Sequence, residues 1–412
     1  MNALFHNFLK HKAICPVEIG IRMPKMSKEN MALICVSLGW FLIFSGRLSI
    51  STILVTIEKS FDINHAEAGL ALTGMWFFYG LMQFPSGVIS DLKGRKVTIL
   101  ASMAIFSVAY LLIGLSVHYL MLFLMLILLG IGGGSFPTAG IAMLSDIFKE
   151  RRGKALGIQA SFGSMAGFMP IVAPVIASFN WRLFFFIWAG LGIFAMYLFL
   201  RCTEESTKLP HGESILKRFV DGAAALRDRK ILFIFAINLV ATLSWIGYIS
   251  FFPTYLIESK AFSEMEAGVS FAILTLGGFI LKPIIGSLSD RYDKKAIMLF
   301  LMSTSAIATI LLVYLHSFIT ILGVSFALSA SSAFFLVANS YLLGLWGERG
   351  RGGRLGFYRS LLILTGSPTS ALIGFYAAKG GFALPFLVIA LLLSIAALLL
   401  LMNIALERHA RR

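Results

Sequence analysis

The chain has 412 residues, of which 58% are hydrophobic and only 13% charged, and its mean hydropathy is +0.86. A soluble domain with a wetted surface does not have this composition, so we expect an integral membrane protein. The formal net charge of +15 is spread over short loops between apolar stretches instead of one soluble face, which argues against nucleic acid as a partner.

Apolar stretches of about 20 residues, long enough to cross the hydrocarbon core of a bilayer, recur along the whole chain. They are predicted to be helices, because unpaired backbone groups are too costly in lipid and the alternating pattern of barrel strands is missing. The sequence therefore predicts an all-α membrane protein that spans the lipid bilayer many times. The twelve predicted transmembrane helices cover residues 32–57, 67–90, 97–117, 119–145, 154–178, 182–201, 230–257, 266–289, 295–315, 317–346, 354–378 and 382–406.

The lysines and arginines indicate how these helices are oriented. Of the 35, 28 lie in the N-terminal tail, in the loops that follow every second helix, and in the C-terminal tail. Because cytoplasmic loops are enriched in Lys and Arg, both termini are expected on the cytoplasmic side of a plasma membrane. The predicted organisation is a cytoplasmic tail (1–31), a first six-helix half (32–201), a cytoplasmic linker (202–229), a second six-helix half (230–406) and a cytoplasmic tail (407–412).

A loop segment that follows the second predicted helix recurs half a chain later. Residues 87–96 read GVISDLKGRK and residues 286–295 read GSLSDRYDKK, with their shared aspartates 199 positions apart. The same spacing relates residues 68–69 to residues 267–268, both of which read AG. Six predicted helices separate equivalent positions, so the two halves should have the same orientation in the membrane and form parallel repeats.

These repeated segments, together with two further features, resemble the major facilitator superfamily of secondary transporters. The further features are the Glu-Arg turns at 150–157 and 348–356, after the fourth and tenth predicted helices, and the segment 180–184 (NWRLF) at the start of the sixth. The resemblance covers essentially the whole chain. It implies twelve helices in two parallel six-helix halves that rock about a central site, in a chain that functions as a monomer.

The resemblance also implies a role for the loop segments, which in this superfamily latch the halves together when the outward-facing state forms. Asp146 is the acid with which Arg95 and Lys96 are expected to pair. The alternative is that the cations only hold the loop in the cytoplasm. The second copy has Asp293 in place of Gly94, so the two latches are not expected to be equally strong. The residues assigned to conformational gating are Gly87, Asp91, Gly94, Arg95, Lys96, Asp146, Arg152, Gly286, Asp290 and Arg291.

Arg47 lies roughly 15 residues into the first predicted helix, near the middle of the membrane. A charge at that depth costs about 3 kcal/mol or more unless it faces water or a partner, so Arg47 is expected to line the central cavity. Lys282 is either a second cation of that cavity or a structural lysine that reaches toward the interface. No Asp or Glu lies in the middle of any predicted helix. The unbalanced cations therefore predict an anionic substrate, whose carboxylate or phosphate Arg47 could bind with two hydrogen bonds.

Other polar side chains follow single faces of several predicted helices and could complete the lining of the cavity. For each of them the alternative is a hydrogen bond between helices, which is common in membrane proteins. The candidate substrate-binding residues are Arg47, Trp40, Tyr79, Gln83, Gln159, Asn238, Trp245, Lys282 and Asn339.

The leading hypothesis is a secondary transporter that moves a small organic anion, coupled to H⁺ or by exchange. The segments 46–51 and 78–87 resemble the branch of the superfamily that moves organic anions, the anion:cation symporters. One alternative is a proton-driven exporter of hydrophobic compounds, because the glycines and prolines of 163–174 are similar to a motif of drug exporters. The other is a membrane sensor that transports nothing. An enzyme, a metal site or a cofactor is not expected, because no nucleophile and base or ligand set is recognisable at one membrane depth.

Overall fold

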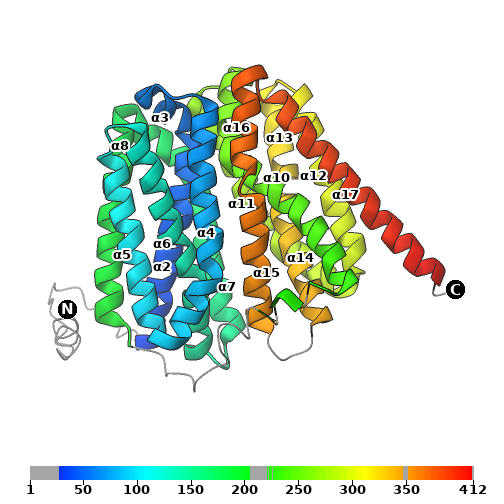
Figure 1. Ribbon diagram of the computed structural model, residues 1–412, viewed down its shortest axis with the longest axis horizontal. Helices are drawn as coiled ribbons and strands as arrows, with labels where there is room; N and C mark the ends of the chain where they lie inside the picture. Colours follow the sequence, from blue (N-terminus) through cyan, green and yellow to red (C-terminus); the bar gives the residue numbers. More distant parts are fainter. Residues whose placement is uncertain (1–26, 205–219, 221, 225, 347–350, 411–412) are drawn as a thin grey trace.

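The computed structural model describes residues 27–204, 220, 222–224, 226–346 and 351–410. All regular secondary structure in these ranges is helical (Figure 1). Most of the predicted N-terminal tail and linker lies outside the described residues. The helices are α2 (Lys28–Thr52), α3 (Leu54–Phe61), α4 (His65–Lys93), α5 (Arg95–Gly114), α6 (Tyr119–Ile147), α7 (Arg152–Met165), the 3-10 helix η1 (Ala166–Phe168), α8 (Met169–Cys202), α10 (Arg229–Lys260), α11 (Glu264–Arg291), α12 (Lys294–Tyr314), α13 (Phe318–Leu328), α14 (Ala330–Leu345), α15 (Arg351–Gly366), α16 (Thr369–Gly380) and α17 (Ala383–Ala410).

Ten helical segments of the described chain are long and apolar enough to cross a membrane. One of them, Arg152–Cys202, is 51 residues long and contains two of the predicted spans, 154–178 and 182–201. Its backbone leaves the helical region at Asn180, where φ is −166° and ψ is 120°, between those two spans. Helix α4 is 29 residues long but is not among the ten. The all-helical membrane architecture is therefore confirmed, and the count of twelve spans stays a prediction.

The helices form two bundles, called here the N-terminal bundle (α2 to α8) and the C-terminal bundle (α10 to α17). Within each bundle the helices pack closely on one another (Figure 1). Large apolar side chains fill the interior of the bundles and also cover the outer faces, where Phe194, Leu391 and Leu398 are each about half exposed. A helix that is apolar on both its inner and its outer face is suited to a lipid environment.

The two ends of the molecule differ in how the bundles meet. The His65 end, at the top of Figure 1, contains α3 and the starts of α4 and α11. There Thr56 Oγ1 donates to Glu264 Oε1 across the two bundles at 3.1 Å. The opposite end, called the Arg95 end, contains the turn between α4 and α5 and the chain end of α17 (Figure 1).

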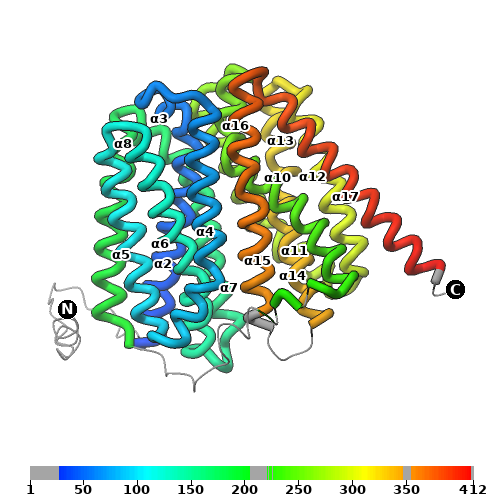
Figure 2. The backbone as a smooth tube through the Cα atoms, in the orientation of Figure 1, coloured from blue at the N-terminus to red at the C-terminus, as the bar shows by residue number. Residues whose placement is uncertain are grey.

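Two helices carry most of the contact between the bundles. Helix α4 packs against α15 and α16, and helix α11 packs against α7, η1 and α8. Figure 2 shows α15 and α16 beside α4 along the line where the bundles meet. Thr73 on α4 donates to the carbonyl oxygen of Ser367 at 3.1 Å and accepts from the N–H of Ala371 at 2.9 Å. These contacts hold the bundles together from the His65 end toward the middle of the molecule.

The internal repeat is visible in how α4 and α11 begin. Asn64 and Glu67 form a capping box at the start of α4, and Ser263 and Glu266 form one at the start of α11, 199 positions later. In each, the cap side chain accepts from the third backbone N–H, and the glutamate accepts from the N–H of the cap residue. The sequence repeat therefore corresponds to a repeat of local structure.

The two copies of the loop segment also differ for a structural reason. Gly94 has a φ of 103°, a conformation that costs a glycine little, and it lies between the end of α4 and the start of α5. The equivalent Asp293 has a φ of −59°, and its side chain caps α12 by accepting from the N–H of Ala296 at 2.9 Å. The second copy replaces a left-handed glycine turn by an N-cap.

Candidate functional site

Arg47 is enclosed by three aromatic rings inside the N-terminal bundle. Its guanidinium carbon lies 4.3 Å from the ring centroid of Tyr79, 5.2 Å from that of Trp76 and 5.3 Å from that of Phe44. Phe44 precedes Arg47 by one turn of α2, and Trp76 and Tyr79 are one turn apart on α4, so helical spacing brings the rings together. Only 5% of the Arg47 surface is exposed. Each desolvated cation–π contact stabilises the charge by up to about 2 kcal/mol.

A hydrogen-bond donor of Arg47 is left without a partner among the described residues. Its Nε has no hydrogen-bond partner in the described chain, and no ion pair to it occurs there. Trp76 Nε1 and Gln83 Nε2, both on α4, are buried donors that also lack a partner among the described residues. A buried donor without an acceptor costs about 1 to 3 kcal/mol, and more if it is charged. This part of the N-terminal bundle therefore has an excess of donors, and no acid of the described chain forms an ion pair with Arg47.

A cleft of about 450 Å³ separates the bundles at the Arg95 end. Gln83, one turn beyond Tyr79 on α4, lies among its walls, so the cleft reaches the neighbourhood of Arg47. Arg152 from the N-terminal bundle and Arg359 from the C-terminal bundle also line it. Arg359 falls inside a predicted membrane span, and its place in the cleft explains how a charge is tolerated there.

Arg95 is the centre of a polar cluster on the N-terminal side of the cleft. Its Nε donates to Asp146 Oδ2 at 2.6 Å, and its Nη1 donates to Asp91 Oδ1 at 2.7 Å and to Ser90 Oγ at 2.9 Å. The pairing of Arg95 with Asp146 that the sequence predicted is therefore present. Lys96 donates to the carbonyl oxygens of Leu200 and Thr203 at the end of α8. These bonds join α4, α5, α6 and α8 inside one bundle.

The second copy of the loop segment also makes contacts within its own bundle. Lys295, the equivalent of Lys96, donates to Glu407 Oε1 at 2.6 Å and to Asn403 Oδ1 at 2.7 Å. Asp290 and Arg291 are exposed, and Gly286 is half-buried beside Leu336. The assignment of all these residues to gating stays a prediction.

The comparisons with known proteins agree with this architecture. The sequence model of the Major Facilitator Superfamily matches residues 34–278 and, in a second match, residues 234–412. The chain belongs to the Major Facilitator Superfamily. Its two overlapping matches cover nearly the whole chain, as the resemblance in the sequence implied. This major facilitator is therefore a multi-pass membrane protein and a transporter, not an enzyme.

Relatives of this major facilitator have been named for different substrates. The chain is 26% identical over 290 residues to the "Probable sulfoacetate transporter SauU" of Cupriavidus necator, an alignment that covers 66% of this chain and 67% of that protein. It is 24% identical to the "Hexuronate transporter" of Bacillus subtilis, over 65% of this chain and 66% of that protein. It is 25% identical to the "Multidrug resistance protein MdtG" of Proteus mirabilis, over 88% of this chain and 93% of that protein.

Solved structures show the same fold. A crystal structure of a bacterial homologue of the human lysosomal transporter Spinster, in an inward-facing and unoccupied conformation, superposes with a TM-score of 0.76. The superposition covers 92% of this chain and 97% of that chain, at 16% sequence identity. The likeness establishes the major facilitator fold and carries no information about the substrate.

The remaining predicted site residues of this major facilitator divide between the two bundles. In the N-terminal bundle, Trp40 stacks on Phe44 and lies against Gly163, and Gln159 is buried beside Gly140. Through Phe44, Trp40 is therefore close to Arg47, whereas Gln159 lies nearer Val36, about three turns earlier on α2. Arg47 itself is wrapped in aromatic rings and is not among the residues that line the cleft.

In the C-terminal bundle, the predicted residues are less closely grouped. Asn238 donates through Nδ2 to the hydroxyl of Tyr358 at 2.8 Å, which is the hydrogen bond between helices given as the alternative to substrate contact. Lys282 is half-buried, with Ser332 close to the same glycine, Gly278. Trp245 and Asn339 are half-buried as well. No hydrogen bond in the described ranges joins these residues to the Arg47 group.

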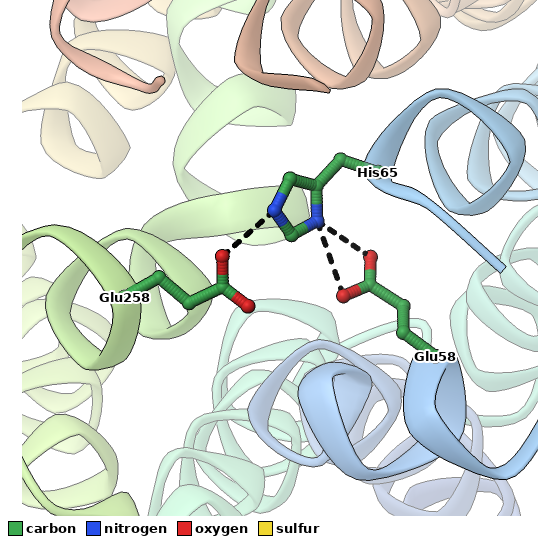
Figure 3. A group of neighbouring side chains, drawn as sticks. All are labelled: Glu58, His65 and Glu258. Carbon is green, nitrogen blue, oxygen red and sulfur yellow. Dashed lines mark hydrogen bonds and ion pairs between the residues drawn. The ribbon is translucent and has the colours of Figure 1, made fainter. Parts of the chain in front are cut away.

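Sequence reasoning missed two sets of residues. Trp76 was not predicted, although its spacing of three residues from Tyr79 places it on the same face of α4. The sequence also contains no set of His, Asp and Glu at ligand spacing, but the fold brings Glu58, His65 and Glu258 together, with one polar atom of each within 4.8 Å of the others (Figure 3). No local pattern could have revealed this cluster, because Glu258 comes from the other half of the chain.

Proposed function

We propose that this chain is a secondary transporter of a small organic anion and that Arg47 binds the anion. The observation that carries the proposal is the buried guanidinium of Arg47, whose Nε has no hydrogen-bond partner in the described chain. A carboxylate, sulfonate or phosphate group supplies both the missing charge and the missing acceptors. The unpartnered donors of Trp76 and Gln83 add to this excess and favour a ligand with several oxygen atoms.

The transport cycle that we propose is alternating access by the two halves, 32–201 and 230–406, joined by the linker 202–229. The distribution of Lys and Arg supports placing the Arg95 end and both tails in the cytoplasm of a plasma-membrane protein. With that orientation, bundles joined at the His65 end and parted at the Arg95 end correspond to the state open to the cytoplasm. The named relatives for sulfoacetate and hexuronate, both organic anions, support the substrate class.

Two alternatives for energy coupling follow from the superfamily, namely symport with H⁺ and exchange of one anion for another. In both, the single chain contains the complete site, so the proposed functional unit is a monomer. The gating residues at the Arg95 end, with Arg95, Asp91 and Asp146 as the central cluster, would rearrange when that end closes.

A second candidate is a proton-driven exporter of hydrophobic compounds. The alignment with the multidrug resistance protein MdtG favours it, because that alignment spans 88% of this chain. The rings of Phe44, Trp76 and Tyr79 would then be the binding surface, and Arg47 would be a structural cation held by them.

Binding by the purified full chain separates the two candidates. The panel consists of sulfoacetate, hexuronates and other small carboxylates. We expect at least one of them to raise the thermal unfolding temperature of the wild type. In Arg47→Ala that increase should be lost. Arg201→Ala is the matched control, because Arg201 is an exposed arginine that also lies over an aromatic ring, 5.5 Å from the centroid of Tyr197.

Two other outcomes of these experiments would contradict the anion proposal. If Arg47→Ala retains binding and uptake of every anion in the panel but alters cellular resistance to lipophilic drugs, the exporter is the better description. If neither anions nor lipophilic compounds are moved in proteoliposomes that contain only this protein, the sensor alternative replaces both transport proposals.

A further inference from the structure

His65 joins the two bundles at the end opposite to the cleft. It is the first residue of α4, and its Nδ1 lies 3.0 Å from Oε1 and 3.1 Å from Oε2 of Glu58 on α3 (Figure 3). Its Nε2 lies 2.7 Å from Oε2 of Glu258 on α10, in the C-terminal bundle. One imidazole ring therefore lies between two carboxylates that belong to different bundles.

The hydrogen-bond distances limit the protonation states that this cluster can have. A neutral imidazole has one N–H donor and one bare nitrogen, whereas an imidazolium has two donors. Ionised carboxylates only accept hydrogen bonds, so His65 can bond to both Glu58 and Glu258 only when it is protonated, or when one carboxyl group itself carries a proton. The bond to Glu258 and the bond to Glu58 can therefore form at the same time only when the cluster holds one proton more than a neutral imidazole and two carboxylates.

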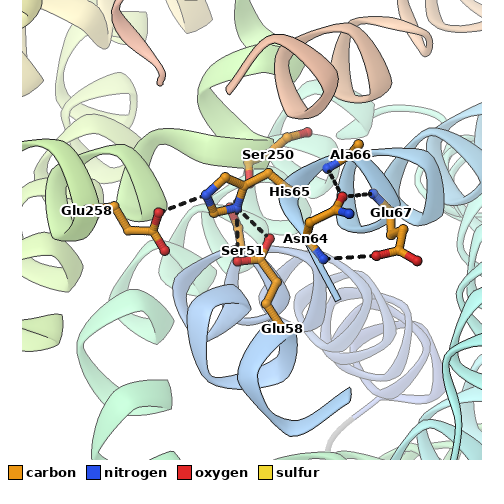
Figure 4. A network of polar contacts seen from close by, with 8 residues as sticks. All are labelled: Ser51, Glu58, Asn64, His65, Ala66, Glu67, Ser250 and Glu258. Atoms are coloured by element: carbon orange, nitrogen blue, oxygen red, sulfur yellow. Dashed lines mark hydrogen bonds and ion pairs between the residues drawn. The ribbon is translucent and has the colours of Figure 1, made fainter. Parts of the chain in front are cut away.

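The Glu58 and His65 side chains are largely shielded from solvent, whereas Glu258 lies at the solvent edge of the cluster. The exposed fraction of the side chain is 6% for Glu58, 17% for His65 and 36% for Glu258. The ring of Phe382, which precedes α17, covers His65 with a centroid distance of 5.0 Å. Figure 4 shows the neighbouring Glu67 turned to its own capping box.

Other charged side chains on the surrounding helices are engaged elsewhere or face solvent. Glu264 accepts from Thr56, Lys260 donates to the carbonyl oxygen of Val313, and Lys379 lies over the ring of Phe375. Lys59 and Asp62 are exposed. Among the described residues, the charge of the cluster is therefore set by Glu58, His65 and Glu258 alone.

The environment favours a bound proton in this closed arrangement. Burial raises the pKa of the Glu58 carboxyl above its ordinary value, an effect that the hydrogen bond from His65 opposes. The hydrogen bond to Glu58 raises the pKa of His65 above its ordinary 6.5, although burial opposes it, and the charge of Glu258 contributes in the same direction. Both residues lie in the connection between the predicted spans 32–57 and 67–90, outside the membrane.

We propose that Glu58, His65 and Glu258 form a proton-binding site that closes the His65 end of the transporter. When the end opens, Glu258 leaves with the C-terminal bundle and only the local Glu58 and His65 pair remains. The closed state then holds the proton more tightly than the open state, so by linkage the proton favours closure. The inference rests on the proposed function, because only a protein that opens at alternate ends has two such states.

The direction of the pH dependence follows from the raised affinity for protons. Closure is fully favoured at low pH, below the ordinary pKa of a histidine, and is lost as the pH rises through the higher pKa of the closed state. With the His65 end facing outside the cell, as the proposed orientation has it, an acidic exterior drives the transporter toward the state open to the cytoplasm. A metal ion is a poorer occupant, because both ring nitrogens already bond to carboxylates.

The test measures the separation of the bundles without any substrate. In the full chain, with Cys15, Cys35 and Cys202 replaced by serine, spin labels are attached at Lys59→Cys on α3 and Ile319→Cys on α13, two exposed positions of the His65 end. In the otherwise unchanged protein, raising the pH from about 5 to about 9 should convert short label distances into long ones. For one proton, the ratio of long to short distances changes by at most about tenfold per pH unit.

Two variants and one control make the outcome decisive. His65→Gln and Glu258→Gln should each abolish the pH dependence, and the second remains informative if the first does not fold. His316→Gln, which alters an exposed histidine at the same end, should leave it intact. The proposal is overturned if wild-type distances do not respond to pH, if both variants respond as the wild type does, or if EDTA alone removes the response and so reveals a metal site.

The label experiment tests the proton site independently of the proposed anion transport. Labels that respond to pH in a protein that binds no anion would leave the proton site standing and reject the anion proposal. Anion binding that depends on Arg47, in a protein whose labels ignore pH, would do the opposite.

Discussion

Gly69 on α4 packs directly against the backbone of Ser370 on α16, leaving no room for a Cβ atom beside the carbonyl oxygen of Ser370. The equivalent glycine 199 positions later, Gly268 on α11, has the same relationship with the carbonyl oxygen of Pro170 on α8. In this related pair, a glycine from each bundle lets a helix approach the backbone of the other bundle. Close helix approach through small residues is a common way to pack helices in membranes.

Replacing either glycine by alanine should weaken closure at the His65 end. In Gly69→Ala and Gly268→Ala the added methyl group overlaps a backbone oxygen that has no side-chain freedom, so the helices must move apart. We expect the label pair on α3 and α13 to show a larger fraction of long distances at every pH. Gly323→Ala is the control, because no heavy atom lies within 4 Å of a Cβ at Gly323. Equal distance distributions in all three variants would contradict this account.

The sequence predicted the parts of the fold that depend on local physics. Long apolar stretches and the repeated loop segment were sufficient for the helices and for the superfamily, whereas the orientation inferred from Lys and Arg stays a prediction. The helix break at Asn180 was also placed correctly between two predicted spans. The number of membrane-spanning helices stays a prediction, because α4, which carries Tyr79, Gln83 and Pro85 along its length, is not among the ten segments that are long and apolar enough to cross a membrane.

The candidate site was predictable only where its residues share a helix. Arg47 is recognisable from its depth, and Tyr79 and Gln83 from their spacing. The enclosure of Arg47 by rings depends on how α2 packs against α4, and no spacing in the sequence reveals that packing. The cluster of His65 was still less accessible, since Glu258 is 193 residues away from it along the chain.

The ring of Tyr79 is expected to hold Arg47 in place for the anion. In Tyr79→Leu the closest cation–π contact is lost, which removes up to about 2 kcal/mol and should weaken anion binding by up to about thirtyfold. Tyr79→Phe keeps the ring and should bind nearly as the wild type does. Titration of each purified variant with the anion that stabilises the wild type measures the difference. If Phe and Leu weaken binding equally, the hydroxyl matters and the cation–π account fails.

Asp91→Asn should slow transport and leave substrate binding unchanged. The variant keeps the shape of the side chain but removes the charge opposite Arg95 Nη1, so Arg95 retains Asp146 as its only charged partner in the described chain. Turnover in proteoliposomes should fall several-fold, whereas the dissociation constant stays the same. Asp290→Asn is the natural comparison, because Asp290 occupies the equivalent position and is exposed, and we expect it to have the smaller effect. Loss of binding in Asp91→Asn would instead place this cluster in the substrate site.

The hydrogen bond between Asn238 and Tyr358 offers a test of whether Asn238 is structural. Both residues are 1% exposed, and Asn238 Oδ1 already lacks a partner among the described residues. Tyr358→Phe would leave the buried amide with no partner at all, which costs about 1 to 3 kcal/mol. The thermal unfolding temperature should fall accordingly, whereas Tyr376→Phe, at an exposed tyrosine, should leave it unchanged.

The double variant Asn238→Leu/Tyr358→Phe completes this test. Replacing both partners of a buried hydrogen bond by apolar groups of similar shape is nearly neutral, so the double variant should regain most of the stability lost in Tyr358→Phe. A structural role predicts this recovery and predicts unchanged anion binding. If the single variant costs nothing and the double variant abolishes anion binding, Asn238 has water or substrate as its partner. It then belongs to the substrate site together with Arg47.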